Sequence, residues 1–234
     1  MYGYCKNSPV NRVDPNGLFD FMGTITPHTD YAVIGVFPSN FLLDRAILKD
    51  FCNAYKSIPI VLVDDMNDFA DAMAFMNKIS VNSNVYTINS HGFVDYEENE
   101  VSFDIGTESV TSDTDFSLLE RGLNGHTVFI GACNVGISYG DSGYELVESM
   151  ARQTNSSVIA ASHPIRAGYK YDGSLGLNRK NPFDKSDLGN SYIMSVNGSL
   201  SDIIYDVSID RINGISWKGK SDYRYVIRQS SENE

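Results

Sequence analysis

Apolar and polar positions along the chain form segments that predict strands and helices in turn. Runs rich in β-branched and aromatic residues predict five strands, over residues 31–37, 58–63, 84–90, 126–132 and 157–161. Between them, apolar residues at helical spacing predict helices over residues 42–55, 68–79, 115–123 and 141–154. Strands that alternate with helices favour parallel pairing through right-handed crossovers. The pattern therefore predicts an α/β protein whose mostly parallel central sheet is flanked by helices on both faces.

Two parts of the chain depart from this alternation. Residues 94–111 are mostly polar but contain a period-two patch, Val101-Ser102-Phe103-Asp104-Ile105, which predicts a hairpin outside the main sheet. Asp113 stands where it could cap the short helix that follows. Toward the C-terminus the pattern weakens, and two short segments there predict strands or a short helix, over residues 192–196 and 203–209.

The composition narrows the class of protein. With 234 residues, of which 42% are hydrophobic, the chain can bury a sizeable core. A net charge of −12 and a pI near 4.7 argue against a nucleic-acid partner, which needs a basic face. There is no run of about 18 apolar residues, so we expect no membrane insertion. The odd cysteine count, without metal-type spacing, favours reduced thiols over disulfides or a zinc site, at Cys5, Cys52 and Cys133.

Two of the predicted strands end at residues that can do chemistry. Ser90-His91-Gly92 ends the third strand and Gly131-Ala132-Cys133 ends the fourth. Sites in open parallel sheets collect at the carboxyl ends of strands, and the connection between these two is long enough for a crossover that makes them neighbours. An imidazole beside a thiol can take its proton and leave a nucleophilic thiolate. The imidazole can then pass that proton to a leaving amine. We therefore expect Cys133 as nucleophile and His91 as base, with the amides of Gly92 and Cys133 forming an oxyanion hole.

The first eighteen residues differ in character from the rest. Asn7-Ser8-Pro9 and Asp14-Pro15-Asn16-Gly17 favour chain reversals. With Val10-Asn11 and Leu18, they closely resemble the end of the core domain of RHS-repeat proteins. The resemblance implies that residues 1–18 are the tail of an RHS core, with a processing site just after Leu18, and that residues 19–234 form a polymorphic toxin domain. It also implies an RHS shell before release, a cognate immunity protein, and a secreted effector that acts in the target-cell cytoplasm.

The Ser-His-Gly and Ala-Cys motifs, in that order on successive strands, resemble those of caspase-like cysteine peptidases over about residues 31–170. This group includes caspases, metacaspases, legumain and gingipains. The resemblance implies a three-layer sandwich and a His91–Cys133 dyad that cleaves target-cell protein. It also places a substrate pocket at Gly131 and around Ser162-His163. Gly131 stands where relatives carry Gln or Glu, so their residue preference does not carry over. No metal or organic cofactor is implied, although some relatives use calcium.

Other interpretations remain open from the sequence. The RHS-like leader also fits a toxin of another enzymatic class, such as a nuclease or an ADP-ribosyltransferase; a zinc deaminase would need a Cys-x-x-Cys pair that the chain lacks. A non-catalytic binding module could use the same fold, with Cys133 as a small buried apolar residue. His163 also ends a predicted strand and rivals His91 as the base. His126 begins its strand at the opposite edge of the sheet from Cys133, and we expect a structural role for it.

Overall fold

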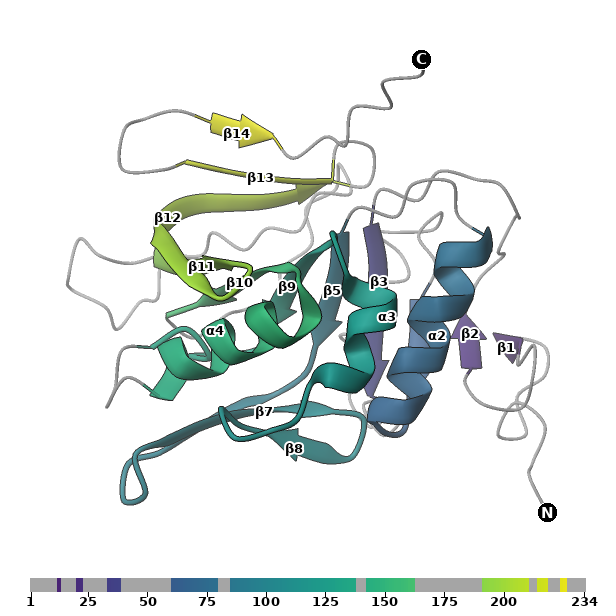
Figure 1. Ribbon diagram of the computed structural model, residues 1–234, viewed down its shortest axis with the longest axis horizontal. Helices are drawn as coiled ribbons and strands as arrows, with labels where there is room; N and C mark the ends of the chain where they lie inside the picture. The colour runs from purple at the N-terminus through teal and green to yellow at the C-terminus, as the bar shows by residue number, and fades with distance from the viewer. Residues whose placement is uncertain are drawn as a thin grey trace.

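Five parallel strands form the centre of the molecule (Figure 1). The computed structural model describes residues 12–13, 20–22, 33–38, 60–79, 85–137, 142–162, 191–210, 214–218 and 224–226. Across the sheet the parallel strands lie in the order β4-β3-β5-β9-β10. Their bounds are Val33–Pro38 (β3), Ile60–Val63 (β4), Val85–Asn89 (β5), Thr127–Gly131 (β9) and Ser157–Ala161 (β10). All five predicted strands are therefore confirmed.

Antiparallel strands continue the sheet on both sides. β2 (Asp20–Met22) pairs with β4, and β11 (Ser191–Val196) pairs with β10, which completes a mostly parallel mixed sheet of seven strands. Beyond these two lie further antiparallel strands, namely β1 (Arg12–Val13), β12 (Ser199–Asp210), β13 (Gly214–Lys218) and β14 (Arg224–Val226). The two C-terminal segments that predicted strands or a short helix are thus strands. Arg12–Val13, within the leader of residues 1–18, pairs with β2.

The central strands are continuous apolar runs because both of their faces are buried. Every residue of β4 is buried, as are Val85 to Ile88 of β5. Val128 and Ile130 contribute to the core on one face, and Phe129 between them is fully buried against the ring of Tyr192 on the other. The central strands are therefore buried on both faces, and the described helices pack against one of them; the helix layer expected on the other face lies outside the described residues.

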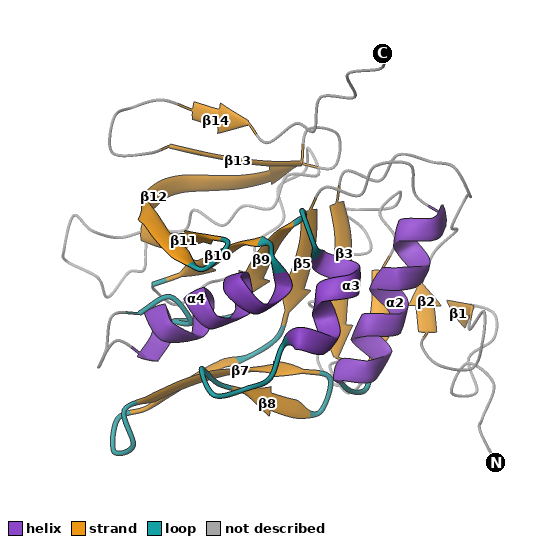
Figure 2. Cartoon of the chain, in the orientation of Figure 1, coloured by secondary structure: helices purple, strands orange, loops and turns teal. Residues whose placement is uncertain are grey.

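The described helices lie together on one face of the sheet (Figure 2). They are α2 (Met66–Ile79), the short 3-10 helix η3 (Ser117–Leu119), α3 (Glu120–Leu123) and α4 (Ser142–Thr154). Apolar residues at helical spacing, such as Phe69, Met73 and Met76 of α2, are fully buried in the core. The helix predicted over residues 42–55 lies outside the described residues. None of the helices in the described part of the chain is long and apolar enough to cross a membrane.

A small antiparallel sheet packs beneath α3 and α4 in the view of Figure 1. Its strands are β6 (Gly92–Asp95), β7 (Glu100–Ile105) and β8 (Glu108–Val110), in that order. Val101, Phe103 and Ile105 of β7 are buried in the same core cluster as the main sheet. The predicted hairpin outside the main sheet is confirmed, and a third strand extends it.

The predicted cap of the short helix is wrong. Asp113 is exposed in the turn that precedes the helix, whereas Asp115 Oδ1 accepts a hydrogen bond of 2.9 Å from the backbone N–H of Ser117. The side-chain and backbone hydrogen bonds from Ser117 lower the pKa of the Asp115 carboxyl. The first turn, η3, begins only at Ser117, and the residue at its N-cap position, Phe116, makes no side-chain cap hydrogen bond.

Candidate active site

The strands that precede His91 and Cys133 are parallel neighbours. β5 pairs with β9 along its whole length, and the last pair joins Asn89 to Gly131. His91 and Cys133 each follow two residues after that pair, on the same edge of the sheet. The expectation that the third and fourth predicted strands lie side by side is confirmed.

Gly92 lies directly against the backbone of Cys133. A Cβ atom at position 92 would be 2.0 Å from the carbonyl oxygen of Cys133 and 2.9 Å from its nitrogen. Neither distance leaves room for a side chain, so only glycine allows this approach. The two residues whose amides are candidates for an oxyanion hole therefore belong to backbone segments in close contact.

Asn89 links β5 to β3 at the same edge. Its Nδ2 donates to the carbonyl oxygen of Thr87 at 3.0 Å and to that of Val36 at 3.3 Å. A Cβ atom at Gly131 would be 2.8 Å from Asn89 Oδ1. Asn89 therefore fills the space into which a side chain at position 131 would project. Asn89 is the last residue of β5 and the next-to-last residue of the strand predicted over residues 84–90, and no sequence motif pointed to it.

The segment after Cys133 is anchored to its surroundings. Asn134 adopts a left-handed conformation with φ of 60°, and its carbonyl accepts a hydrogen bond of 3.1 Å from the N–H of Ile137. The N–H of Gly136 donates to the carbonyl of Ala161, at the end of β10, at 2.8 Å. These contacts fix the position of the backbone that follows Cys133. The side chain of Cys133 is half-buried.

A carboxylate that the sequence analysis missed lies near His91. The β6–β7 ladder ends at the pair Gly92–Phe103, and His91 and Asp104 are the residues directly beyond that pair. Asp104 is half-buried; burial raises the pKa of its carboxyl, and the charge of His91 acts in the opposite direction. The period-two pattern and the turn between β6 and β7 carry the signal that could have revealed this pair.

The remaining residues that the sequence singled out lie after β10, before β9 or outside the described residues. Ser162 follows β10 directly and is half-buried, next to the strand that ends before Cys133. His163 and Leu18 lie outside the described residues. His126 precedes β9 at the opposite end from Cys133, and its ring packs edge-on against Tyr86 with centroids 5.2 Å apart. This position fits the structural role expected for it.

Among the described residues, no three His, Cys, Asp or Glu side chains are grouped so that they could hold a metal ion. A comparison with protein-family models finds none that matches the chain, and a comparison with curated proteins finds no match. The functional argument therefore depends on the chain's own residues and on the geometry described above.

Proposed function

We propose that the chain is a cysteine endopeptidase with a caspase-like fold that acts as a toxin in competition between bacteria. The observation that carries this proposal is the meeting of two strand ends. His91 and Cys133 each stand two residues beyond the last pair of neighbouring parallel strands, and Gly92 contacts the backbone of Cys133.

The strand order supports a site at this edge. The parallel strands occur in the chain as β3, β4, β5, β9 and β10 but lie in the sheet as β4-β3-β5-β9-β10. The direction in which the chain adds strands reverses between β3 and β5, and ligands in such sheets bind at the carboxyl ends beside that point. His91 follows β5 at this end. We infer that the fold is the three-layer sandwich of caspase-like peptidases.

The chemistry follows from the groups present. His91 takes the proton of Cys133, and the Cys133 thiolate attacks the scissile carbonyl carbon. The backbone N–H groups of Gly92 and Cys133 donate hydrogen bonds to the resulting oxyanion. The C–N bond then breaks, His91 gives its proton to the leaving amine, and a thioester remains on Cys133. Water, deprotonated by His91, hydrolyses the thioester and restores the thiol.

The RHS-like leader supports the biological setting. In this proposal an RHS shell holds the toxin until the chain is cut after Leu18, and the effector then acts on a protein in the target-cell cytoplasm. A cognate immunity protein restrains it in the producing cell. Gly131, Ser162 and His163 are the proposed contacts for the substrate residue before the cut. No nucleic acid, membrane insertion or cofactor enters the proposal.

New protein termini in intoxicated cells test the proposal. The wild-type chain, Cys133→Ala and His91→Ala are each expressed in a susceptible host, with the exposed hairpin variant Glu97→Ala as a matched control. We expect growth arrest and new N-termini with wild type and Glu97→Ala only. Equal toxicity in all four strains at equal protein levels would refute the peptidase and point to another class of toxin.

A further inference from the structure

We propose that Asp104 is a positioning residue for His91, an inference that rests on the peptidase function proposed above. Asp104 belongs to β7 in the small sheet, whereas His91 and Cys133 follow strands of the main sheet. The small sheet thus supplies a charged partner to a base that the main sheet positions.

The register of the hairpin brings the two residues together. β6 and β7 pair Gly92 with Phe103 and Phe93 with Ser102, and the ladder ends there, so His91 and Asp104 are the two residues directly beyond its last pair. The charge of His91 acts on the Asp104 carboxyl, as expected for residues this close. Directly opposite residues in an antiparallel pair have Cβ atoms about 5 Å apart and project to the same face.

Burial shows which face this is. Val101, Phe103 and Ile105 of β7 project into the core, so Asp104 projects to the opposite, outer face. Phe93 is 51% exposed, and its ring lies near the ring of His91 with centroids 6.4 Å apart. The His91 side chain is therefore on the outer side as well, where Asp104 lies.

Among the residues that the structure describes, His91 is the charged partner that acts on Asp104. On β8 the residue opposite Asp104 is Ser109, which carries no charge. The acidic side chains nearest along the small sheet are Glu100 and Glu108, on β7 and β8, and like charges do not stabilise a carboxylate. Burial opposes ionisation of Asp104, and the charge of His91 favours its charged form.

A carboxylate in this position would assist the reaction in two ways. It would accept a hydrogen bond from one N–H of the His91 ring, which fixes the ring orientation and leaves the other nitrogen for the Cys133 proton. It would also stabilise the imidazolium that forms when Cys133 loses its proton.

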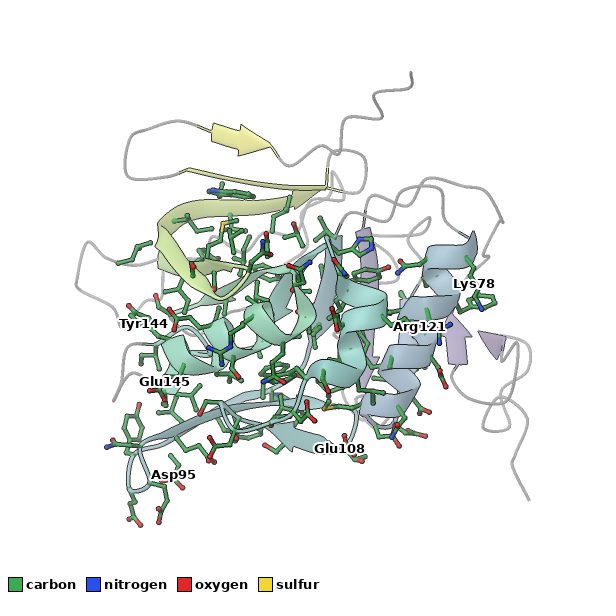
Figure 3. The ribbon with its side chains drawn as sticks, viewed as in Figure 1. Lys78, Asp95, Glu108, Arg121, Tyr144 and Glu145 are labelled. Atoms are coloured by element: carbon green, nitrogen blue, oxygen red, sulfur yellow. The ribbon has the colours of Figure 1, made fainter. Side chains whose placement is uncertain are left out.

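Kinetics of two matched variants test this role. Asp104→Asn and Asp95→Asn each replace a carboxylate of the same hairpin by an amide, but Asp95 lies toward the far end of the hairpin (Figure 3). With a peptide that spans a mapped cleavage site, we expect Asp104→Asn to lower kcat about 10- to 100-fold with little change in KM, and Asp95→Asn to stay within about twofold. Asp104→Glu should recover part of the loss. Equal kcat for the two Asn variants would overturn the inference.

A titration separates this inference from the peptidase proposal, because it needs no substrate. The carboxyl carbon of Asp104 is titrated by NMR in the wild-type protein and in His91→Gln, with Asp115 as internal reference. Loss of the His91 charge should raise the pKa of Asp104 further and leave Asp115 unchanged. This result without any peptidase activity would uphold the pairing and reject the function. An active enzyme in which Asp104 titrates identically in both proteins would reject the pairing and keep the function.

Discussion

Gly92 governs how closely the two reactive strand ends approach each other. A Cβ atom at Gly92 would be 2.0 Å from the Cys133 carbonyl oxygen, whereas one at Gly131 would be 2.8 Å from the side-chain oxygen of Asn89 and 3.1 Å from the carbonyl oxygen of Ile88. The two glycines therefore differ in what an added methyl group would displace. At Gly92 the backbone of the nucleophile itself would have to move.

We expect Gly92→Ala to lower kcat/KM about 100-fold, because a shift of about 1 Å in the reacting groups has an effect of this size. Gly131→Ala should lose much less, since Asn89 Oδ1 can give way. Peptide cleavage by both purified variants, with circular dichroism to establish that they are folded, makes the comparison. Wild-type activity in Gly92→Ala would mean that this contact does not shape the site.

Stability as a function of pH distinguishes a positioning role of Asp104 from a structural one. Burial raises the folded-state pKa of Asp104 above its ordinary value of 3.8. Its contribution to stability is therefore fully present below pH 3.8 and is lost as the pH rises through the folded-state pKa. In Asp104→Asn the side chain does not ionise, so stability is not lost at this position as the pH rises. Its unfolding free energy at pH 7 should equal or exceed that of wild type, by less than about 1 kcal/mol, in urea titrations at pH 7. A clear destabilisation instead would indicate a structural role.

For single residues, the sequence pattern predicts reactive side chains at strand ends but does not predict which residues on different strands lie next to each other. His91 and Cys133 were predictable because each directly follows a run that stops at a reactive side chain. Asp104 was not singled out, since its position opposite His91 depends on the register set by the turn between β6 and β7. Asn99 lies in that turn and adopts a left-handed conformation with φ of 55°.

Among the elements, the small sheet is anchored at two places along the carboxyl edge of the main sheet. At one end Gly92 lies against the backbone of Cys133, two residues after β9; at the other the N–H of Thr107 donates to the carbonyl of Asp64, after β4, at 2.7 Å. Glu108 of β8 also accepts a hydrogen bond of 3.1 Å from the N–H of Met66, the first residue of α2. The start of α2 thus joins the two sheets.

The cap of α2 provides a test at this scale. The N–H of Asp68 donates to Asp65 Oδ1 at 2.9 Å, and Asp68 Oδ2 accepts from the N–H of Asp64 at 2.9 Å. Asp65→Ala should lower the unfolding free energy by about 1 kcal/mol, the usual effect of losing an N-terminal cap. Asp71→Ala, on the exposed side of the same helix, should change it by less than about 0.5 kcal/mol. Urea unfolding of both variants checks this, and equal values would argue against the cap.

The strength of each periodic pattern decided which elements could be predicted. The buried strands β4, β5, β9 and β10 and the helix α4 have strong signals, and their predicted ranges agree with the structure to within about two residues. β1 and β2 contain two and three residues, which is too short to show a period. The partner of β2, β4, is also distant in the sequence, so only the folded chain reveals that pairing.

In the whole molecule, one hydrophobic core joins the small sheet to the main sheet and the helices. Phe103 of the small sheet is fully buried in this core, whereas Phe93 on the neighbouring strand is mostly exposed. The two sheets should therefore unfold together. The fold class was predictable from the alternation of strands and helices, but this shared core depends on contacts between distant segments that no local pattern encodes.

We expect Phe103→Ala to lower the unfolding free energy by about 3–5 kcal/mol, and Phe93→Ala to lower it by less than about 1 kcal/mol. Urea unfolding can be followed by circular dichroism and by the fluorescence of Trp217, the single tryptophan, which is buried in β13. Coincident transitions would show one cooperative unit. Two separate transitions would mean that the C-terminal strands unfold apart from the rest.

The central claim is that His91 activates Cys133, and the rate at which iodoacetamide alkylates each cysteine tests it most directly. Mass spectrometry follows Cys5, Cys52 and Cys133 in the wild-type protein and in His91→Ala. The account predicts that Cys133 reacts fastest, and faster than free cysteine below neutral pH, and that His91→Ala slows this one site by about tenfold or more. A Cys133 that reacts no faster than the other two, or at the same rate without His91, would contradict it.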